Sequence, residues 1–259
     1  MGLQDDITPL LITFDEMPNI ARTIGRLAWA KRIVVVDSGS TDGTLEFLAR
    51  DPRVEIHHRP FDSFAEQCNF GLSLVRTEWV LSLDADYELS DELAAGLASL
   101  QPAADVSGFR ARFVYRIHGR PLRGSLYPPR MVLYRVRGAR YDSEGHGHRV
   151  RVAGNVSTLD GVVFHDDRKP LARWFRSQLK YAATEAHHLL EAQPVELSFV
   201  DRVRRWGWPA PFLVVAYVLV VKRALLDGRA GWFYAFQRLC AEVLLALELL
   251  DRRLSARVP

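Results

Sequence analysis

The chain has 259 residues, of which 48% are hydrophobic and 25% are charged, with 17 Gly, 13 Pro and 2 Cys. This composition excludes disordered, collagen-like and disulfide-scaffold proteins, and the length suits one large α/β domain or a domain with an appendage. A formal net charge of +3 is too small to indicate nucleic-acid binding. Cys68 and Cys240 lack metal-ligand spacing, which favours a reducing compartment.

The N-terminal segment shows no export signal. It has neither a basic region nor a long apolar run, and Asp6 stands where a myristoylation signal requires Ser or Thr. The apolar run at residues 10–14 is short and predicts a first strand. We therefore expect the protein to stay in the cytosol.

The first hundred residues alternate between strand and helix patterns. Strands are predicted at residues 10–14, 33–36, 54–56 and 79–83, and helices are predicted from residues 20, 40 and 64 onward. The β-branched run 33–36 is typical of a buried parallel strand. The alternation indicates right-handed βαβ units and an open parallel sheet.

After about residue 105 the pattern changes. Residues 109–115, 131–136 and 150–152 alternate like strands between loops rich in Gly, Pro and Arg, which predicts a mixed extension that closes the open edge of the sheet. From Pro170 onward the apolar residues follow the spacing of an amphipathic helix.

The C-terminal region contains two apolar segments. Residues 212–221 form a run about half as long as the roughly 20 residues of a spanning helix, and a helix predicted at 232–254 carries charged residues among its leucines. Tryptophans and arginines around a short apolar helix are typical of a segment that lies on a membrane surface. The alternative is an ordinary helical hairpin packed on the sheet domain.

Polar residues follow the predicted strands, where an open parallel sheet binds its ligands. They are Thr13, Asp15 and Glu16 after the first strand, Asp37, Ser38 and Gly39 after the second, Gln67 and Asn69 in or after the third helix, and Asp84 and Asp86 after the fourth strand. The neighbouring residues 40–42 have an alternative role as a helix cap.

Asp84 and Asp86 give the sharpest chemical signal. In an extended chain residues i and i+2 point the same way, so these two carboxylates reach in parallel from a strand end. Like charges in a cleft repel, and Mg²⁺ or Mn²⁺ relieves that repulsion while keeping substrate phosphate oxygens as further ligands. The alternative is a surface turn with two solvated aspartates.

The segments 11–16, 34–44 and 79–86 together resemble the family 2 glycosyltransferases of GT-A fold, and more narrowly the bacterial branch that includes lipopolysaccharide-core glucosyltransferases. The resemblance implies an α/β, Rossmann-like, mostly parallel sheet flanked by helices, with a C-terminal helical extension on the membrane surface. It implies a nucleotide-sugar-binding half at 1–100, an acceptor and catalytic half at 101–190, and the extension at 191–259.

The resemblance also implies a nucleotide-sugar donor. Thr13 and Glu16 would contact the base and ribose, and Asp37 would accept a hydrogen bond from the base, which favours a UDP-sugar. Asp84 would contact the ribose or the metal, and Asp86 would be the main ligand of Mg²⁺ or Mn²⁺ at the diphosphate. A cation there stabilises the charge that grows on the leaving nucleoside diphosphate.

Inverting transfer further requires a carboxylate that takes the proton of the acceptor hydroxyl. Glu144 is our first candidate for this base and Asp142 our second. The family branch would place a His-Glu pair here, whereas Arg149 follows His148 in this chain. A polar turn without a catalytic role is the alternative.

The segment 163–170 ends another predicted strand with polar groups. His165 resembles a family histidine that follows a strand, and it would act as a neutral metal ligand or a diphosphate donor. Arg168 and Lys169 would clamp phosphate at the start of the following helix. Zinc held by His146, His148 and His165 is disfavoured, because the Asp84 and Asp86 pair is rich in oxygen ligands.

We therefore expect an inverting, metal-dependent glycosyltransferase that acts on a cell-envelope glycan or lipid-linked acceptor. Its basic, tryptophan-bearing tail would hold it on the cytoplasmic face of the inner membrane. A non-catalytic scaffold that binds nucleotide sugar or glycan is the alternative. A nucleotidyltransferase is disfavoured, because the segment 13–16 lacks the Gly-rich, basic loop that such enzymes need after the first strand.

Overall fold

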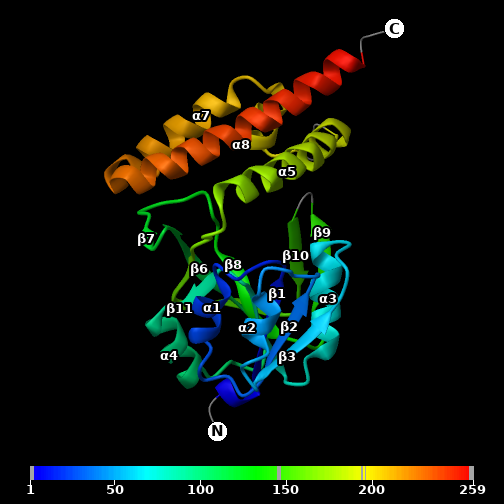
Figure 1. Cartoon of the computed structure of the whole chain (residues 1–259), viewed down its shortest axis with the longest axis vertical. Helices are drawn as coiled ribbons and strands as arrows, with labels where there is room; N and C mark the ends of the chain where they lie inside the picture. Colours follow the sequence, from blue (N-terminus) through cyan, green and yellow to red (C-terminus); the bar gives the residue numbers. More distant parts are fainter. Residues whose placement is uncertain (1–2, 145–146, 194, 196, 257–259) are drawn as a thin grey trace. The chain divides into compact units, whose positions relative to one another are not determined.

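The computed structural model describes residues 3–144, 147–193, 195 and 197–256 (Figure 1). The chain forms two compact units. The first consists of Met1–Gly119 and Tyr127–Arg168, and the second of Arg120–Leu126 and Lys169–Pro259. The division that we predicted from the sequence, by the role of each part, instead has its boundaries at residues 100 and 190.

A mixed sheet forms the centre of the first unit, with the strand order β3-β2-β1-β4-β8-β6-β11-β5. Its strands are β1 (Ile7–Thr13), β2 (Ile33–Asp37), β3 (Val54–His58), β4 (Trp79–Asp84), β5 (Tyr87–Leu89), β6 (Val106–Ile117), β8 (Arg130–Arg135) and β11 (Asn155–His165). Strands β1 to β4 are mutually parallel. Strand β8 is antiparallel to both neighbours, and β5 is antiparallel to β11.

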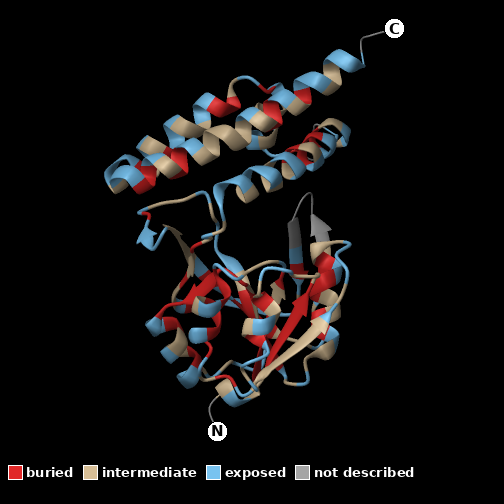
Figure 2. Ribbon diagram, viewed as in Figure 1, coloured by how far each residue is buried: buried red, intermediate tan, exposed pale blue. Residues whose placement is uncertain are grey.

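Helices cover both faces of this sheet, namely α1 (Ile20–Gly25), α2 (Thr44–Leu48), α3 (Phe64–Leu74) and α4 (Asp91–Ser99), and a 3₁₀ turn, η1 (Leu3–Asp6), precedes β1. Alternate residues of one strand enter different cores: Val35 packs with α1, whereas Val34 and Val36 pack with α3. Figure 2 shows the resulting concentration of buried residues in the central strands. Burial on both faces explains why the apolar run 33–36 forms a parallel strand.

A two-stranded antiparallel ribbon of β9 (Arg140–Glu144) and β10 (Gly147–Arg151) packs beside α3. The side chain of Asn69 on α3 bonds the backbone of Tyr141 twice, donating to its carbonyl oxygen at 3.0 Å and accepting from its N–H at 2.8 Å. The Tyr141 hydroxyl in turn donates to Ser82 on β4 at 2.8 Å. The ribbon is therefore anchored near the carboxyl end of β4.

The second unit is helical. It contains α5 (Leu171–Glu191), α6 (Phe199–Trp206), α7 (Ala210–Ala216), the π-helical turn η2 (Tyr217–Val221), the 3₁₀ turn η3 (Ala224–Asp227) and α8 (Gly228–Ser255). The short strand β7 (Arg120–Pro121) belongs to the segment Arg120–Leu126 of this unit. Residues Ala186 and Leu189 of α5 pack with Leu245 and Leu249 of α8. Among the described residues, no helix combines the length and apolar character that crossing a bilayer requires.

Polar contacts complete the second unit. The Arg204 guanidinium lies between Glu185 at 2.7 Å and Glu242 at 3.1 Å, which joins α6 to α5 and α8. The segment 120–126 binds α8 through Leu126, whose N–H donates to the Tyr234 hydroxyl at 2.9 Å. The predicted architecture, an α/β sheet domain flanked by helices and followed by a helical extension, is confirmed.

Glycine 231 allows η3 to approach α8, and its replacement tests that packing. A Cβ atom at Gly231 would lie 1.7 Å from the Ala224 carbonyl oxygen, so we expect Gly231→Ala to lower the unfolding midpoint, at a cost of about 1–3 kcal/mol. A Cβ atom at the helical Gly96 would meet nothing within 4 Å, so Gly96→Ala should stabilise by about 0.5–1 kcal/mol. Thermal unfolding of both variants checks this, and a Gly231→Ala protein as stable as wild type would contradict it.

Candidate active site

Thr13 and Asp37 form a buried hydrogen-bonded pair at the carboxyl ends of β1 and β2. Oδ2 of Asp37 accepts from the Thr13 hydroxyl at 2.8 Å and from the Ser40 hydroxyl at 2.5 Å. Oδ1 accepts from the backbone N–H groups of Gly39 and Ser40, both at 2.8 Å. A carboxylate offers about four acceptor positions, so Asp37 is fully engaged in shaping this loop. Gly39 has φ +100°, a conformation that favours glycine.

The loops after β1 and β2 are also bonded to each other. The Asp15 N–H donates to the Ser40 hydroxyl at 2.7 Å, and the Glu16 N–H donates to the Thr44 hydroxyl at 2.8 Å. Asp42 accepts from the N–H of Met17 at 3.0 Å. Burial raises the pKa of Asp42, but hydrogen bonds from the Thr44 hydroxyl and from the backbone N–H groups of Met17 and Thr44 outweigh burial and lower the pKa. Residues 40–42 therefore connect the loop after β1 to the loop after β2, in addition to preceding α2.

Asn19 links the loop after β1 to the loop after β11. It is buried, and its side-chain amide donates to Glu16 at 2.9 Å and to Asp167 at 3.0 Å. Its Oδ1 accepts from the N–H of Arg168 at 2.9 Å. Sequence reasoning missed this residue, although an asparagine directly before a helix is a recognisable signal. Glu16 was predicted to bind the nucleotide-sugar donor. It is held in place by Asn19, which also contacts Asp167 in the loop after β11.

Asp86 and His165 lie together, at the place where β5 and β11 pair. The antiparallel register sets Tyr87 opposite His165, and the Asp166 N–H donates to the Asp86 carbonyl at 3.2 Å. The His165 Nε2 atom lies 3.2 Å from the Asp86 carboxylate. Burial lowers the pKa of His165, but the carboxylate of Asp86, with smaller effects from Asp84 and Asp167, outweighs burial and raises it. Asp84, Asp86 and His165 therefore form one electrostatic cluster.

Three tyrosine rings surround His165. The centroids of Tyr87, Tyr115 and Tyr127 lie 5.1, 4.7 and 5.0 Å from that of the imidazole. The hydroxyl groups of Tyr87 and Tyr127 are hydrogen-bonded to each other. These rings were not predicted from the sequence, in which only the position of Tyr87 directly after Asp86 offered a signal. Their packing fixes the plane of the imidazole beside Asp86.

Arg168 is ion-paired within the first unit. Its guanidinium donates to the buried Asp166 carboxylate at 3.0 and 2.7 Å. A second pair joins Arg22 of α1 to Glu88 of β5 at 2.8 Å. Lys169 begins the second unit, so its contact with the donor diphosphate stays a prediction.

The two candidate bases lie on the β9–β10 ribbon. The Asp142 carboxylate is ion-paired with Arg151 of β10 and lies 3.8 Å from the Arg140 guanidinium, whereas the register sets Arg149 opposite Asp142. Because adjacent residues of a strand face opposite sides, Asp142 points away from the face on which Tyr141 is buried. No described contact joins Asp142 to the Asp84–Asp86 cluster. The side chain of Glu144 lies outside what the structure describes, as do those of His146 and His148.

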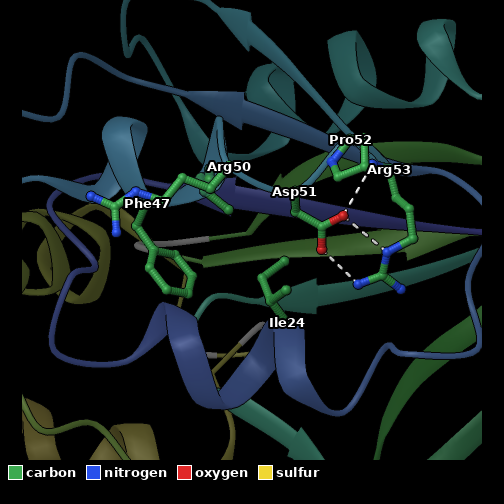
Figure 3. Close-up of a pocket in the computed structure, with 7 residues that line it drawn as sticks. Ile24, Phe47, Arg50, Asp51, Pro52 and Arg53 are labelled. Atoms are coloured by element: carbon green, nitrogen blue, oxygen red, sulfur yellow. Dashed lines mark hydrogen bonds and ion pairs between the residues drawn. The ribbon is translucent and has the colours of Figure 1, made fainter.

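A separate pocket lies at the opposite edge of the sheet (Figure 3). It is lined by Ile24, Phe47, Leu48, Arg50, Asp51, Pro52 and Arg53, from the ends of α1 and α2 and the turn that enters β3. Two of its charged groups bind each other, since the Arg53 guanidinium lies 2.6 Å from the Asp51 carboxylate. This pocket is remote from the strand ends that carry Asp37 and Asp84.

Comparison with known proteins agrees with this geometry. The family model for glycosyl transferase family 2 matches residues 10–151. An uncharacterized glycosyltransferase of Rickettsia bellii (strain RML369-C) is 23% identical over 254 residues, which are 92% of this chain and 86% of that protein. The lipopolysaccharide core biosynthesis glycosyltransferase LpsC of Rhizobium meliloti (strain 1021) is 28% identical over 201 residues, or 72% of each chain.

Among solved structures, glucosyl-3-phosphoglycerate synthase from Mycobacterium tuberculosis in complex with Mn²⁺, UDP and phosphoglyceric acid has a TM-score of 0.46 and 17% identity, over 70% of this chain and 77% of that chain. The family match covers more than half of the 259 residues and includes the strands that end in Thr13, Asp37 and Asp84. The chain therefore belongs to glycosyl transferase family 2 and is a glycosyltransferase.

Proposed function

We propose that this protein is an inverting, metal-dependent glycosyltransferase that moves a sugar from a UDP-sugar to a cell-envelope glycan or lipid-linked acceptor. The observation that carries the proposal is the cluster of Asp84, Asp86 and His165 at the carboxyl end of β4, with 3.2 Å between the Asp86 carboxylate and the His165 imidazole. Ligands of open α/β sheets bind at this edge.

The donor atoms of this cluster suit Mg²⁺ or Mn²⁺. Within the described residues no group of three or more His, Cys, Asp or Glu side chains is arranged to hold a metal ion. One or two carboxylates suffice for a cation that takes its remaining ligands from water and from the diphosphate of the substrate. Asp86, with Asp84 and His165, would hold the ion, which when bound supplies positive charge to the departing nucleoside diphosphate.

The joined loops after β1 and β2 would bind the nucleoside. Thr13 and Asp37 form the floor of this region, and Glu16 is oriented by Asn19 at 2.9 Å. A base N–H that donates to Asp37 would replace one of the hydroxyl donors now on its carboxylate, Thr13 or Ser40. A hydrogen-bonded carboxylate in this position supports selection of a base with an N–H donor, such as uracil.

The acceptor side of the proposal rests on the relatives and on the second unit. LpsC is named for lipopolysaccharide core biosynthesis, which supports an envelope glycan as the acceptor class. The proton of the acceptor hydroxyl would pass to a carboxylate, with Glu144 and Asp142 as candidates.

Exposed apolar side chains of the second unit support contact with a membrane surface. Trp206, Trp208 and Phe212 are 69%, 71% and 71% exposed, and Arg223 and Arg229 are also exposed. Large aromatic side chains with basic neighbours bind the interfacial region of anionic bilayers. We propose that the second unit binds the cytoplasmic face of the inner membrane.

Replacing Asp86 tests the catalytic proposal. We expect Asp86→Asn to reduce donor turnover with Mn²⁺ by on the order of 100-fold, because the variant loses a charge that holds the cation at the diphosphate. Turnover of a panel of UDP-sugars, with and without acceptor extract, is the measurement. Asp91→Asn is the matched control, since Asp91 is an exposed aspartate at the start of α4. Equal turnover in wild type and Asp86→Asn would refute the role of Asp86.

Substituting the exposed aromatic residues tests the membrane proposal. We expect Trp206→Ser, Trp208→Ser and Phe212→Ser together to reduce sedimentation with anionic phospholipid vesicles at least about 10-fold, because interfacial binding scales with the buried apolar area. Phe61→Ser is the control, since Phe61 is 52% exposed on the first unit. Truncation is less informative, because α8 supplies the core partners of α5. Undiminished sedimentation of the triple variant would overturn the assignment.

A further inference from the structure

Arg130 lies at the same sheet end as the aspartate cluster. It is the first residue of β8, which pairs antiparallel with β4 in a register that sets Leu133 opposite Leu81. Because the two strands run in opposite directions, the start of β8 lies beside the end of β4, where Asp84 stands. No role was predicted for Arg130 from the sequence.

A chain of ring contacts connects Arg130 to the cluster. The guanidinium carbon of Arg130 lies 4.5 Å from the centroid of the Tyr127 ring, and that ring lies 5.0 Å from His165. His165 in turn contacts Asp86 at 3.2 Å. A guanidinium stacked on an aromatic face is held in place without losing its N–H donors. Burial lowers the pKa of Arg130, but Tyr127, Tyr87 and Asp84 outweigh burial and raise it, which agrees with their proximity.

Arg135, on the same strand, provides a comparison. Its guanidinium also lies 4.5 Å from an aromatic centroid, that of Trp79, and it is ion-paired with Glu78. Arg22 and Arg168 near the cluster are likewise paired, with Glu88 and Asp166. By contrast, Arg130 has no carboxylate within ion-pair distance in the part of the chain that the structure describes. As a whole residue, Arg130 is exposed at the strand end.

We propose that Arg130 binds the diphosphate of the nucleotide-sugar donor and stabilises the nucleoside diphosphate as it leaves. The proposal rests on the proposed function and adds a second cationic group to it. Guanidinium stays charged and presents paired N–H donors that match phosphate oxygens. Asp84 and Asp86 are both negative, so a single divalent ion leaves most of the diphosphate charge uncompensated, and Arg130 supplies the next positive charge at this strand end.

The charge balance of the reaction supports this placement. In the transfer, the bond between the anomeric carbon and the diphosphate oxygen breaks, and its electron pair stays on that oxygen. The acceptor oxygen forms the new bond to the anomeric carbon and gives its proton to a carboxylate base. The nucleoside diphosphate therefore leaves with one more negative charge, which a fixed cation stabilises more strongly than it stabilises the intact donor.

Titration calorimetry with UDP and uridine, in Mn²⁺, tests the proposal. We expect Arg130→Gln to weaken UDP binding about 10- to 100-fold and to leave uridine binding unchanged, because only the diphosphate contacts the guanidinium. Arg130→Lys should recover part of the loss, since lysine keeps the charge without the paired donors. Arg135→Gln, the matched control on the same strand, should bind UDP as wild type does.

The outcomes separate this proposal from the proposed function. If wild type binds no UDP, the proposed function fails and this inference fails with it. If wild type binds UDP and Arg130→Gln binds it equally, only the role of Arg130 is overturned. Equal losses for UDP and uridine would show a structural effect and would also overturn it. Should Arg130→Gln not fold, as shown by thermal unfolding, Arg130→Lys decides, because UDP binding equal to wild type refutes the paired contact.

Discussion

The site depends on the negative charge concentrated at the end of β4. Asp86 is mostly buried, and carboxylates in such surroundings need a nearby positive charge. In this protein His165 approaches Asp86 to 3.2 Å, and three tyrosine rings hold the imidazole there. The paired strands β5 and β11 bring these groups together from distant parts of the chain. The proposed cation and donor diphosphate would bind at this concentration of negative charge.

The residues at the ends of the early strands could be predicted from the sequence. The run 33–36 forms β2 because its apolar side chains are buried on both faces of the sheet. In parallel strands all carboxyl ends lie at one edge, so residues that directly follow such runs, among them Asp37 and Asp84, were expected there. The order of predicted strands and helices along the chain is sufficient to place these residues, and the family match at residues 10–151 agrees with that placement.

The contacts that complete the site depend on pairings that no local pattern specifies. Asn19 reaches Asp167, which is 148 residues away, and Arg130 approaches the cluster only because β8 inserts antiparallel beside β4. The segment 120–126 interrupts the first unit and binds α8, so the division of the chain could not follow a single boundary. Asp142 was a candidate base by composition, but its carboxylate is ion-paired with Arg151 of the neighbouring strand.

The proposed function requires that Asp84 and Asp86 bind the donor through a divalent cation. The most direct measurement is the affinity of the wild-type protein for UDP in Mn²⁺ and in EDTA, with Mn²⁺ binding followed by electron paramagnetic resonance. We expect UDP and Mn²⁺ each to bind at least about 10-fold more tightly when the other is present, as reciprocal coupling requires. Equal UDP affinity in Mn²⁺ and EDTA would contradict it.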